Sequence, residues 1–277
     1  MSLRLHEQPS AFAGYARMAL LSCYRDRGLI FSDLILATLA PYLVQAIIWL
    51  SIYRGSDHHL IAGYSLTELL FYYAFAIAIS RLNNGYDIIF DLSERVTSSS
   101  LDPALVKPTP YPLQRLYDWI GATTLYIIPL GIVLSIQIFT AGTAGAPLLS
   151  VGSGYTIACF VVLSNSVILA FLVAMSLAIA CFWVVKSDML LTLLLALQAF
   201  LGGTLLPPEF WPDWAEPILS YNPFRFMIAA PAELLARDRS DVLAWLLCGG
   251  LFYTLLFALL VIWLWQRAMR RYEGVGG

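Results

Sequence analysis

Few residues of this sequence have the types and spacing that chemistry requires. A P-loop needs a lysine directly after its glycine-rich turn, where the lysine reaches the phosphates of a nucleotide. The two lysines, Lys107 and Lys186, each follow a valine. The sequence therefore predicts that this chain hydrolyses no nucleotide itself, and that any such hydrolysis comes from another chain.

The remaining candidates for chemistry are weak for the same reason of spacing. The histidines are His6, His58 and His59, and none of them lies in an apolar segment where it could act as the base for Ser153 in its Gly-Ser-Gly turn. Metal-binding spacing of cysteine and histidine is also missing, so the four cysteines are expected to be small packing residues. We therefore expect no catalytic residue, no metal site and no cofactor in this chain.

The composition indicates that the solvent of this chain is lipid. Of the 277 residues, 60% are hydrophobic and 12% are charged, about half the ~25% charged fraction of a soluble domain. The mean hydropathy is +0.75. These values exclude an ordinary soluble globule, and two lysines with a net charge of -2 exclude a basic stripe for nucleic acid.

The charge-free stretches predict one all-α integral membrane domain over residues 1–277. A helix needs about 20 apolar residues to cross a bilayer, and the stretch from 119 to 185 is long enough for two helices around a turn-rich segment at 140–154. The expected transmembrane helices number six, at about 30–53, 60–80, 118–140, 155–185, 189–206 and 243–265.

The distribution of positive charge predicts that both termini lie inside. Twelve of the sixteen lysines and arginines fall on one side of this arrangement of spans, and positively charged loops are retained in the cytoplasm. Residues 10–28 repeat apolar residues at helical spacing among arginines. They predict an amphipathic helix on the inner membrane surface, or alternatively an ordinary cytoplasmic lead-in helix.

The two long connections have different compositions. The inner segment 81–117 mixes charges with four prolines and predicts a compact docking element with a short helix over 91–96, the alternative being a solvated connector. The outer segment 202–235 has six prolines and many aromatic residues, which favour the headgroup level of a bilayer. It predicts an outer re-entrant helical hairpin, and a packed extracellular cap is the alternative.

Polar side chains inside the expected spans are few. Glu68 is the ionisable one, and it could line an aqueous path, pair with Arg54 or pack as a hydrogen-bonded carboxyl. The amides could contact a substrate, although hydrogen bonds between helices are the favoured interpretation. The candidate pathway residues are Gln45, Glu68, Asn165 and Gln198, and Gln137 is a further buried amide.

Three stretches together resemble a known family. They are residues 101–108 (LDPALVKP), residues 202–207 (GGTLLP) continuing to 222–225 (NPFR), and residues 270–272 (RRY) followed by Gly276 and Gly277. In order and position they are similar to permease subunits of type-two ATP-binding-cassette exporters, in particular the bacterial six-span subgroup.

The resemblance implies a mechanism and partners. In such exporters the first inner loop contacts a separate cytoplasmic ATPase, which carries the ATP and magnesium, and two permeases form the pathway in the bacterial inner membrane. The implied coupling residues are Asp91, Glu94, Arg95, Leu101, Asp102, Pro103, Lys107 and Pro108. The implied outer re-entrant residues are Gly202, Gly203, Pro207, Asn222, Pro223, Phe224 and Arg225.

Three functional hypotheses follow from the sequence. The first is the transmembrane subunit of an ATP-driven exporter that works as a dimer with like or unlike permeases. The second is a self-contained channel or ion-coupled carrier, which would need more ionisable residues within the spans or an inverted repeat. The third, an intramembrane enzyme, lacks a nucleophile with a base. The sequence does not identify the substrate.

Overall fold

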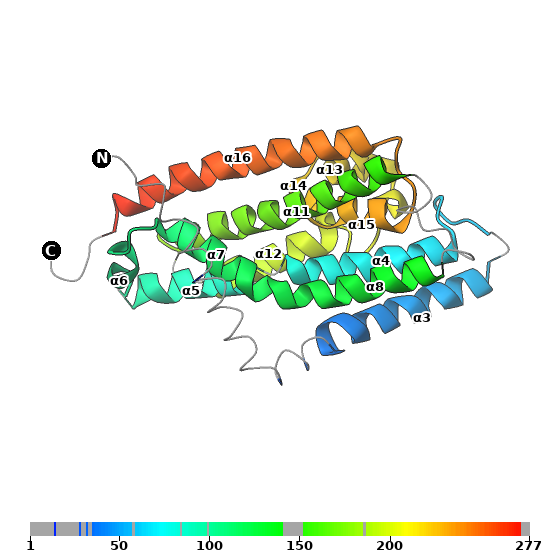
Figure 1. The fold of residues 1–277 in the computed structure, drawn as a ribbon, viewed down its shortest axis with the longest axis horizontal. Coiled ribbons are helices and arrows are strands. Elements are labelled where there is room, and N and C mark those ends of the chain that lie inside the picture. Colours follow the sequence, from blue (N-terminus) through cyan, green and yellow to red (C-terminus); the bar gives the residue numbers. More distant parts are fainter. Residues whose placement is uncertain are drawn as a thin grey trace.

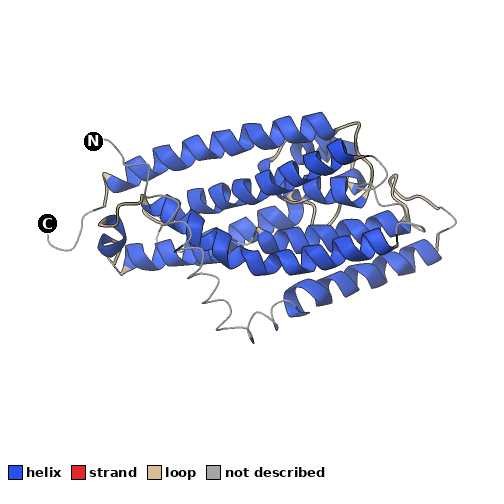
Figure 2. Ribbon diagram, viewed as in Figure 1, coloured by secondary structure: helices blue, strands red, loops and turns tan. Residues whose placement is uncertain are grey.

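The computed structural model is an elongated bundle of helices that run along its long axis (Figure 1). It describes residues 14, 28, 32, 35–56, 59–83, 85–98, 100–140, 152–184 and 187–272. Within these residues the regular structure is helical, and no strand occurs (Figure 2). The expected all-α class is therefore confirmed.

The first expected span is a π-turn, η2 (Ile35–Leu39), that continues into α3 (Ala40–Arg54). Pro41 lies in the first turn of α3, where its missing N–H costs no helical hydrogen bond. Ala46 and Trp49 are the buried residues of α3, so this helix lies at the edge of the bundle. The interfacial helix expected at 10–28 lies, apart from residues 14 and 28, outside the described residues.

The second expected span corresponds to α4 (Leu66–Leu82), and α5 (Tyr86–Thr97) follows it after a break. The expected start at residue 60 is wrong, because residues 61–64 form a bridged turn and Ser65 then caps α4. The helix expected over 91–96 is longer in the structure than the sequence predicted. The observed helix α5 begins at Tyr86, since Ile88, Ile89 and Leu92 are buried on one of its faces.

The inner segment contains less loop than the sequence predicted. After α5 come α6 (Asp102–Leu105) and α7 (Tyr111–Thr123), which continues through η3 (Thr124–Tyr126) into α8 (Ile127–Phe139). The prolines were expected to prevent a long helix, but α7 begins at Tyr111 with Pro112 in its first turn, where proline is tolerated. The helical stretch that contains the expected span at 118–140 therefore begins earlier, at Tyr111, and ends at Phe139.

The remaining long helices form the centre and one side of the bundle. They are α11 (Ser153–Ala180), α12 (Ser187–Leu201) and α16 (Leu243–Met269). Four helical stretches are long and apolar enough to cross a membrane: 35–54, 111–139, 153–180 and 243–269. The helices α4, with 17 residues, and α12, with 15, are shorter than the about 20 residues that one crossing of a bilayer needs. Most of the turn expected at 140–154 lies outside the described residues.

The proline-rich outer segment forms short helices at one end of the bundle, and the last two of them are largely buried. These are η4 (Pro208–Phe210), η5 (Asp213–Ala215), α13 (Glu216–Ser220), α14 (Pro223–Met227) and α15 (Ala229–Ala236). Every residue of α15 is buried, and the helix lies between α4 and α11 (Figure 1). We call this end of the molecule the α13 end and the opposite end the α6 end.

Much of the lateral surface of the bundle consists of exposed apolar side chains. Large side chains of α3, α8 and α16 are exposed, among them Ile47, Ile132 and Leu255. An exposed apolar surface of this extent is unfavourable in water and indicates contact with a bilayer. The chain is therefore a multi-pass membrane protein.

The turn after α12 generates a stability prediction. Gly203 has a φ of +81°, and a Cβ there would lie 2.5 Å from the hydroxyl of Tyr72 and 2.9 Å from the Cβ of Ala229. We expect Gly203→Ala to lower the melting temperature of the purified protein by about 5 °C. The left-handed backbone would be strained with an alanine, and the added Cβ would overpack the site, so both effects destabilise the folded state. The matched control is Gly131→Ala in α8, where nothing lies within 4 Å. An equal effect of both substitutions would contradict the close packing assigned to Gly203.

Candidate functional site

The α6 end of the molecule is organised around the carboxylate of Asp91 on α5. Its Oδ2 accepts from Nε of Arg95 at 2.8 Å and from Nη1 of Arg115 at 2.9 Å. The same oxygen accepts from the hydroxyl of Tyr111 at 2.8 Å. Because Tyr111 and Arg115 belong to α7, this cluster fixes α5 to α7.

The cluster lowers the pKa of Asp91. Partial burial by itself opposes ionisation, but the hydrogen bond from Arg95 and the positive charge of Arg115 outweigh it. The pKa of Asp91 therefore lies below the ordinary value for an aspartate. Two residues of the expected coupling set, Asp91 and Arg95, thus hold the local structure together, while Glu94 is exposed on α5.

The short helix α6 is held in place by both α7 and the turn after α16. Leu101 and Ala104 are buried, and Nε2 of Gln114 donates to the carbonyl oxygen of Ala104 at 2.9 Å. The hydroxyl of Tyr272, close after α16, donates to Oδ1 of Asp102 at 2.8 Å. A four-residue helix is marginal alone, so these contacts fix its position.

The outward face of α6 is exposed and partly apolar. Val106 is 85% exposed, and Leu105 beside it is also exposed. The other exposed members of the expected coupling set lie around them: Pro103, Lys107 and Pro108. Figure 1 shows α6 at the extreme end of the molecule. Leu105 and Val106 thus form an exposed apolar tip beside Lys107, which we call the α6 tip.

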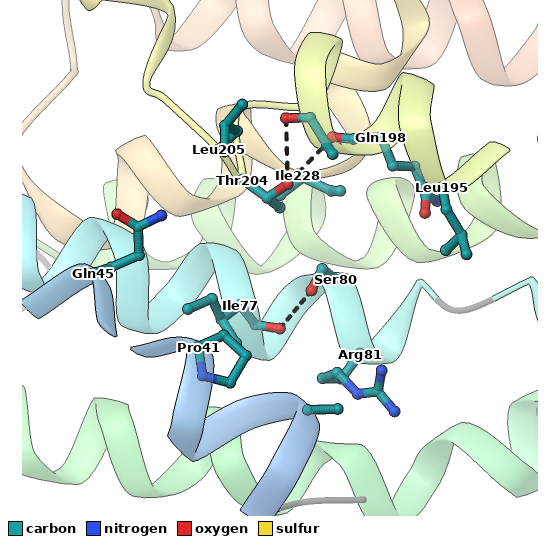
Figure 3. Close-up of a pocket in the computed structure, with 12 residues that line it drawn as sticks. Pro41, Gln45, Ile77, Ser80, Arg81, Leu195, Gln198, Thr204, Leu205 and Ile228 are labelled. Carbon is teal, nitrogen blue, oxygen red and sulfur yellow. Dashed lines mark hydrogen bonds between the residues drawn. The ribbon is translucent and has the colours of Figure 1, made fainter. Parts of the chain in front are cut away.

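A second candidate site is a pocket of about 290 Å³ between α3, α4, α12 and the turn after α12 (Figure 3). Gln45 of α3 and Gln198 of α12 both line it, so the fold brings together two of the four expected pathway residues. Ser80 and Arg81 add further polar groups from the last turn of α4. The rest of the lining is mainly apolar, which suits an amphipathic ligand.

The pocket adjoins the break between α4 and α5. Nδ2 of Asn83 donates to the carbonyl oxygen of Met227 at 2.6 Å. The carbonyl oxygen of Asn83 accepts from Nε2 of Gln198 at 3.4 Å. A Cβ at Gly85 would lie 2.5 Å from the Cβ of Ala174, so α11 closes against the backbone there. One lining residue, Gln198, therefore contacts the break between α4 and α5.

The other expected pathway residues lie elsewhere and have structural contacts. Glu68 was expected about 12 Å inside a span, but it lies in the first turn of α4. There its Oε2 accepts from the backbone N–H of Ser65 at 2.8 Å in a capping box. Oδ1 of Asn165 accepts from Thr254 at 3.0 Å, and Nε2 of Gln137 donates to Leu235 at 2.8 Å. These amides join helices, as the favoured interpretation predicted.

The expected outer re-entrant residues shape the α13 end. Oδ1 of Asn222 accepts from the backbone N–H of Arg225 at 2.9 Å and so caps α14, with Pro223 in its first turn. Gly202, Gly203, Pro207 and Phe224 are buried, and Gly203 packs closely against Tyr72 and Ala229. Their roles in the fold are close packing and capping.

A buried ionic network at the α13 end was not predicted from the sequence. Nη2 of Arg225 lies 3.2 Å from Oε2 of Glu233, which is fully buried, and Nη1 of Arg239 lies 3.4 Å from the same oxygen. Glu209 joins Arg237 at 2.8 Å and Arg239 at 2.9 Å. The signal that could have found it was the mixture of acids and arginines in one apolar segment.

Arg81 was also not predicted as a site residue, because its position after the expected span assigned it to the inner loop. It belongs to the last turn of α4 and lines the pocket, with its guanidinium carbon 5.4 Å from the centre of the Tyr126 ring.

Over the described ranges, no group of three histidine, cysteine, aspartate or glutamate residues could hold a metal ion. His59 is exposed and His58 lies outside the described residues.

The Asp91 cluster generates a prediction with a pH dependence. Asp91→Asn should lower the free energy of unfolding by about 2 kcal/mol, because Arg115 loses a charged partner. Glu94→Gln, the matched exposed control on α5, should change it by less than about 0.5 kcal/mol.

The sign of the pH effect follows from the lowered pKa of Asp91. Its contribution is complete above the unfolded carboxyl pKa of about 3.9 and is lost as the pH falls through the folded pKa. Thermal unfolding should therefore show a constant difference between wild type and Asp91→Asn from about pH 7 to 5, shrinking below about pH 4. A difference that grows on acidification would refute the assignment.

Comparison with known proteins agrees with this geometry. Residues 39–276 match the family model described as ABC-2 family transporter protein. No curated protein matches the chain. The match begins in the first span and runs past α16, so it includes both candidate sites. The chain therefore belongs to the ABC-2 family of transporter proteins, as a membrane-embedded permease subunit.

Proposed function

We propose that this permease is the transmembrane subunit of an ATP-driven exporter and that a separate cytoplasmic ATPase docks on α6. The observation that carries the proposal is the exposed apolar tip at Leu105 and Val106, held in place by α7 and by Tyr272. A solvated connector would not need this support. ATP and magnesium would be held by the ATPase.

The proposed topology has six spans with both termini in the cytoplasm of a bacterial cell and the chain in the inner membrane. The α6 end is then cytoplasmic, and the short helices α4 and α12 cross together with the elements that continue them. For α4 this element is the first turn of α5, which follows the break at Asn83. For α12 it is the buried pair α14 and α15, which packs beside α4.

The pathway is proposed to run through the pocket lined by Gln45 and Gln198 and to be completed by a second permease, of like or unlike sequence. The edge position of α3 supports this assignment, since Ile47 and Ile48 expose their side chains on a helix next to the pocket. Two such subunits facing each other would enclose the polar lining and exclude lipid from it.

Movement of α6 can reach the pocket through a short chain of contacts. The Asp91 cluster makes α5 and α7 move as one body, and α5 is connected along the chain to α4 through the Asn83 junction. Asn83 contacts Gln198, which lines the pocket. Docking of the ATPase would therefore bias the angle at this junction and the access of the pocket to one side.

A self-contained channel or ion-coupled carrier is the second candidate. It would not need the supported tip of α6, and Gln137 and Asn165, which could have extended a polar track beyond the pocket, instead join helices. Dependence of the chain on an ATPase bound at α6 separates the two candidates.

The docking surface generates the first functional prediction. Val106→Asp should reduce, at least about tenfold, co-purification with a co-expressed ATP-binding-cassette ATPase that binds the wild-type chain, because a charge replaces an exposed apolar anchor. Leu60→Asp is the matched control, since Leu60 is likewise exposed but precedes α4 at the opposite end. The proposal fails if both variants, or neither, lose the ATPase, or if the purified chain alone hydrolyses ATP.

The pocket generates the second functional prediction. In a chain whose native cysteines are replaced by alanine, Gln45→Cys should react with a water-soluble maleimide at a rate that changes severalfold when the ATPase is trapped with ATP. The reason is that alternating access changes the exposure of the pocket. Phe139→Cys, on an exposed position outside the pocket, is the control. Equal rates with and without ATP would count against a pathway at Gln45.

A further inference from the structure

A groove of about 610 Å³ lies at the α6 end between the end of α11 and the last turns of α16. Its lining combines two tryptophans, one amide and three arginines: Trp183, Trp263, Gln266, Arg267, Arg270 and Arg271. Trp183 follows α11 closely, and the other five come from α16 or the turn after it. The groove is separate from the α6 tip and from the Gln45 pocket.

The groove carries positive charge that the described protein does not neutralise. Across the residues that the structure describes, no carboxylate pairs with Arg267, Arg270 or Arg271. The arginines that do pair with carboxylates are Arg95, Arg115, Arg225, Arg237 and Arg239. Three guanidiniums within two helical turns, without a described carboxylate beside them, are suited to an anion, and their planar shape suits phosphate in particular.

The walls of the groove place that anion at a membrane surface. Trp183 and Trp263 are both exposed, and tryptophan is enriched at the headgroup level of a bilayer. The guanidinium carbon of Arg267 lies 5.4 Å from the centre of the Trp263 ring. The charged groups are thus held beside aromatic groups that mark the boundary between lipid tails and headgroups.

An apolar stripe leads from the middle of the bundle to the groove. Leu255, Leu259 and Ile262 recur at intervals of three and four residues along α16, and more than half of each side chain is exposed. The stripe ends one turn before Gln266. A molecule that filled both surfaces would need an acyl chain and an anionic head.

We propose that this groove binds an anionic phospholipid, with its phosphate on Arg267, Arg270 and Arg271 and an acyl chain along α16. Arginines at the end of a span also fix its orientation, and that role alone would require neither a groove nor aromatic walls. The combination of shape, concentrated positive charge and a continuous apolar stripe distinguishes a specific lipid site from general charge bias.

The site adjoins the element that supports α6. Tyr272 directly follows Arg271, and its hydroxyl holds Asp102 of α6. The ring of Trp265, on the same part of α16, stacks on Tyr111 with centroids 5.4 Å apart. A bound lipid would therefore order the end of α16 that supports the α6 tip. The lipid site itself does not depend on whether an ATPase docks there.

The test is native mass spectrometry of the purified full chain in detergent, titrated with phosphatidylglycerol or with phosphatidylcholine. We expect wild type to prefer phosphatidylglycerol at least about tenfold. The triple variant Arg267→Gln, Arg270→Gln, Arg271→Gln should show a preference below about twofold. The triple lysine variant at the same positions keeps the charge that orients the span, and its preference should lie between the two.

The outcomes are decisive in both directions. The proposal is overturned if wild type shows no preference, or if the glutamine variant elutes as a folded monodisperse protein and keeps the preference. It is also overturned if excess inorganic phosphate displaces the lipid completely, because the groove would then be a site for a free anion. Loss of the ATPase by the glutamine variant with an unchanged lipid preference would make the groove a protein contact instead.

Discussion

The junction between α4 and α5 depends on the side chain of Asn83, which donates to the carbonyl oxygen of Met227 at 2.6 Å. A break in a helix inside a bilayer frees backbone groups that no water can satisfy, so it persists only where protein groups replace the lost bonds. Here Nε2 of Gln198 donates to the backbone carbonyl oxygen of Asn83 in the break, while the side chain of Asn83 bonds to Met227 at the end of α14, and Gly85 lets α11 approach the backbone. Beyond the break, α5 packs against α11 and α12, and the pocket lies beside the last turn of α4.

The same junction separates two parts of the molecule with different kinds of packing. Toward the α13 end, α15 is completely buried beside α4, and the charges of Arg225 and Glu233 are enclosed as a pair. Toward the α6 end, α5 and α7 are joined by the partly exposed cluster at Asp91. The two parts on either side of the break are therefore stabilised differently, one by enclosed packing and the other by a few charged contacts.

The ionic network at the α13 end shows how charge is tolerated in this fold. Two acids and three arginines share their charges over distances of 2.8 to 3.4 Å, so none faces lipid alone. At the α6 end the three arginines of α16 and its following turn have no such partners among the described residues. This contrast between the two groups of arginines is the basis of the lipid site.

The sequence alone determined that this is an all-α membrane protein, because a high apolar content and charge-free stretches of about 20 residues allow helices to cross a bilayer. It also located the segment that contains α6 and the proline-rich segment at 202–235. It did not predict the contacts at the Asn83 break, since Asn83 lies beyond the apolar stretch and its partners are distant in sequence.

The sequence also placed Glu68 too deep, because the capping box with Ser65 decides where α4 begins. Only the tertiary structure brought Gln45 beside Gln198 and separated them from Asn165. Spacing along a chain fixes which residues share one helix, but contacts between helices far apart in sequence are set by packing.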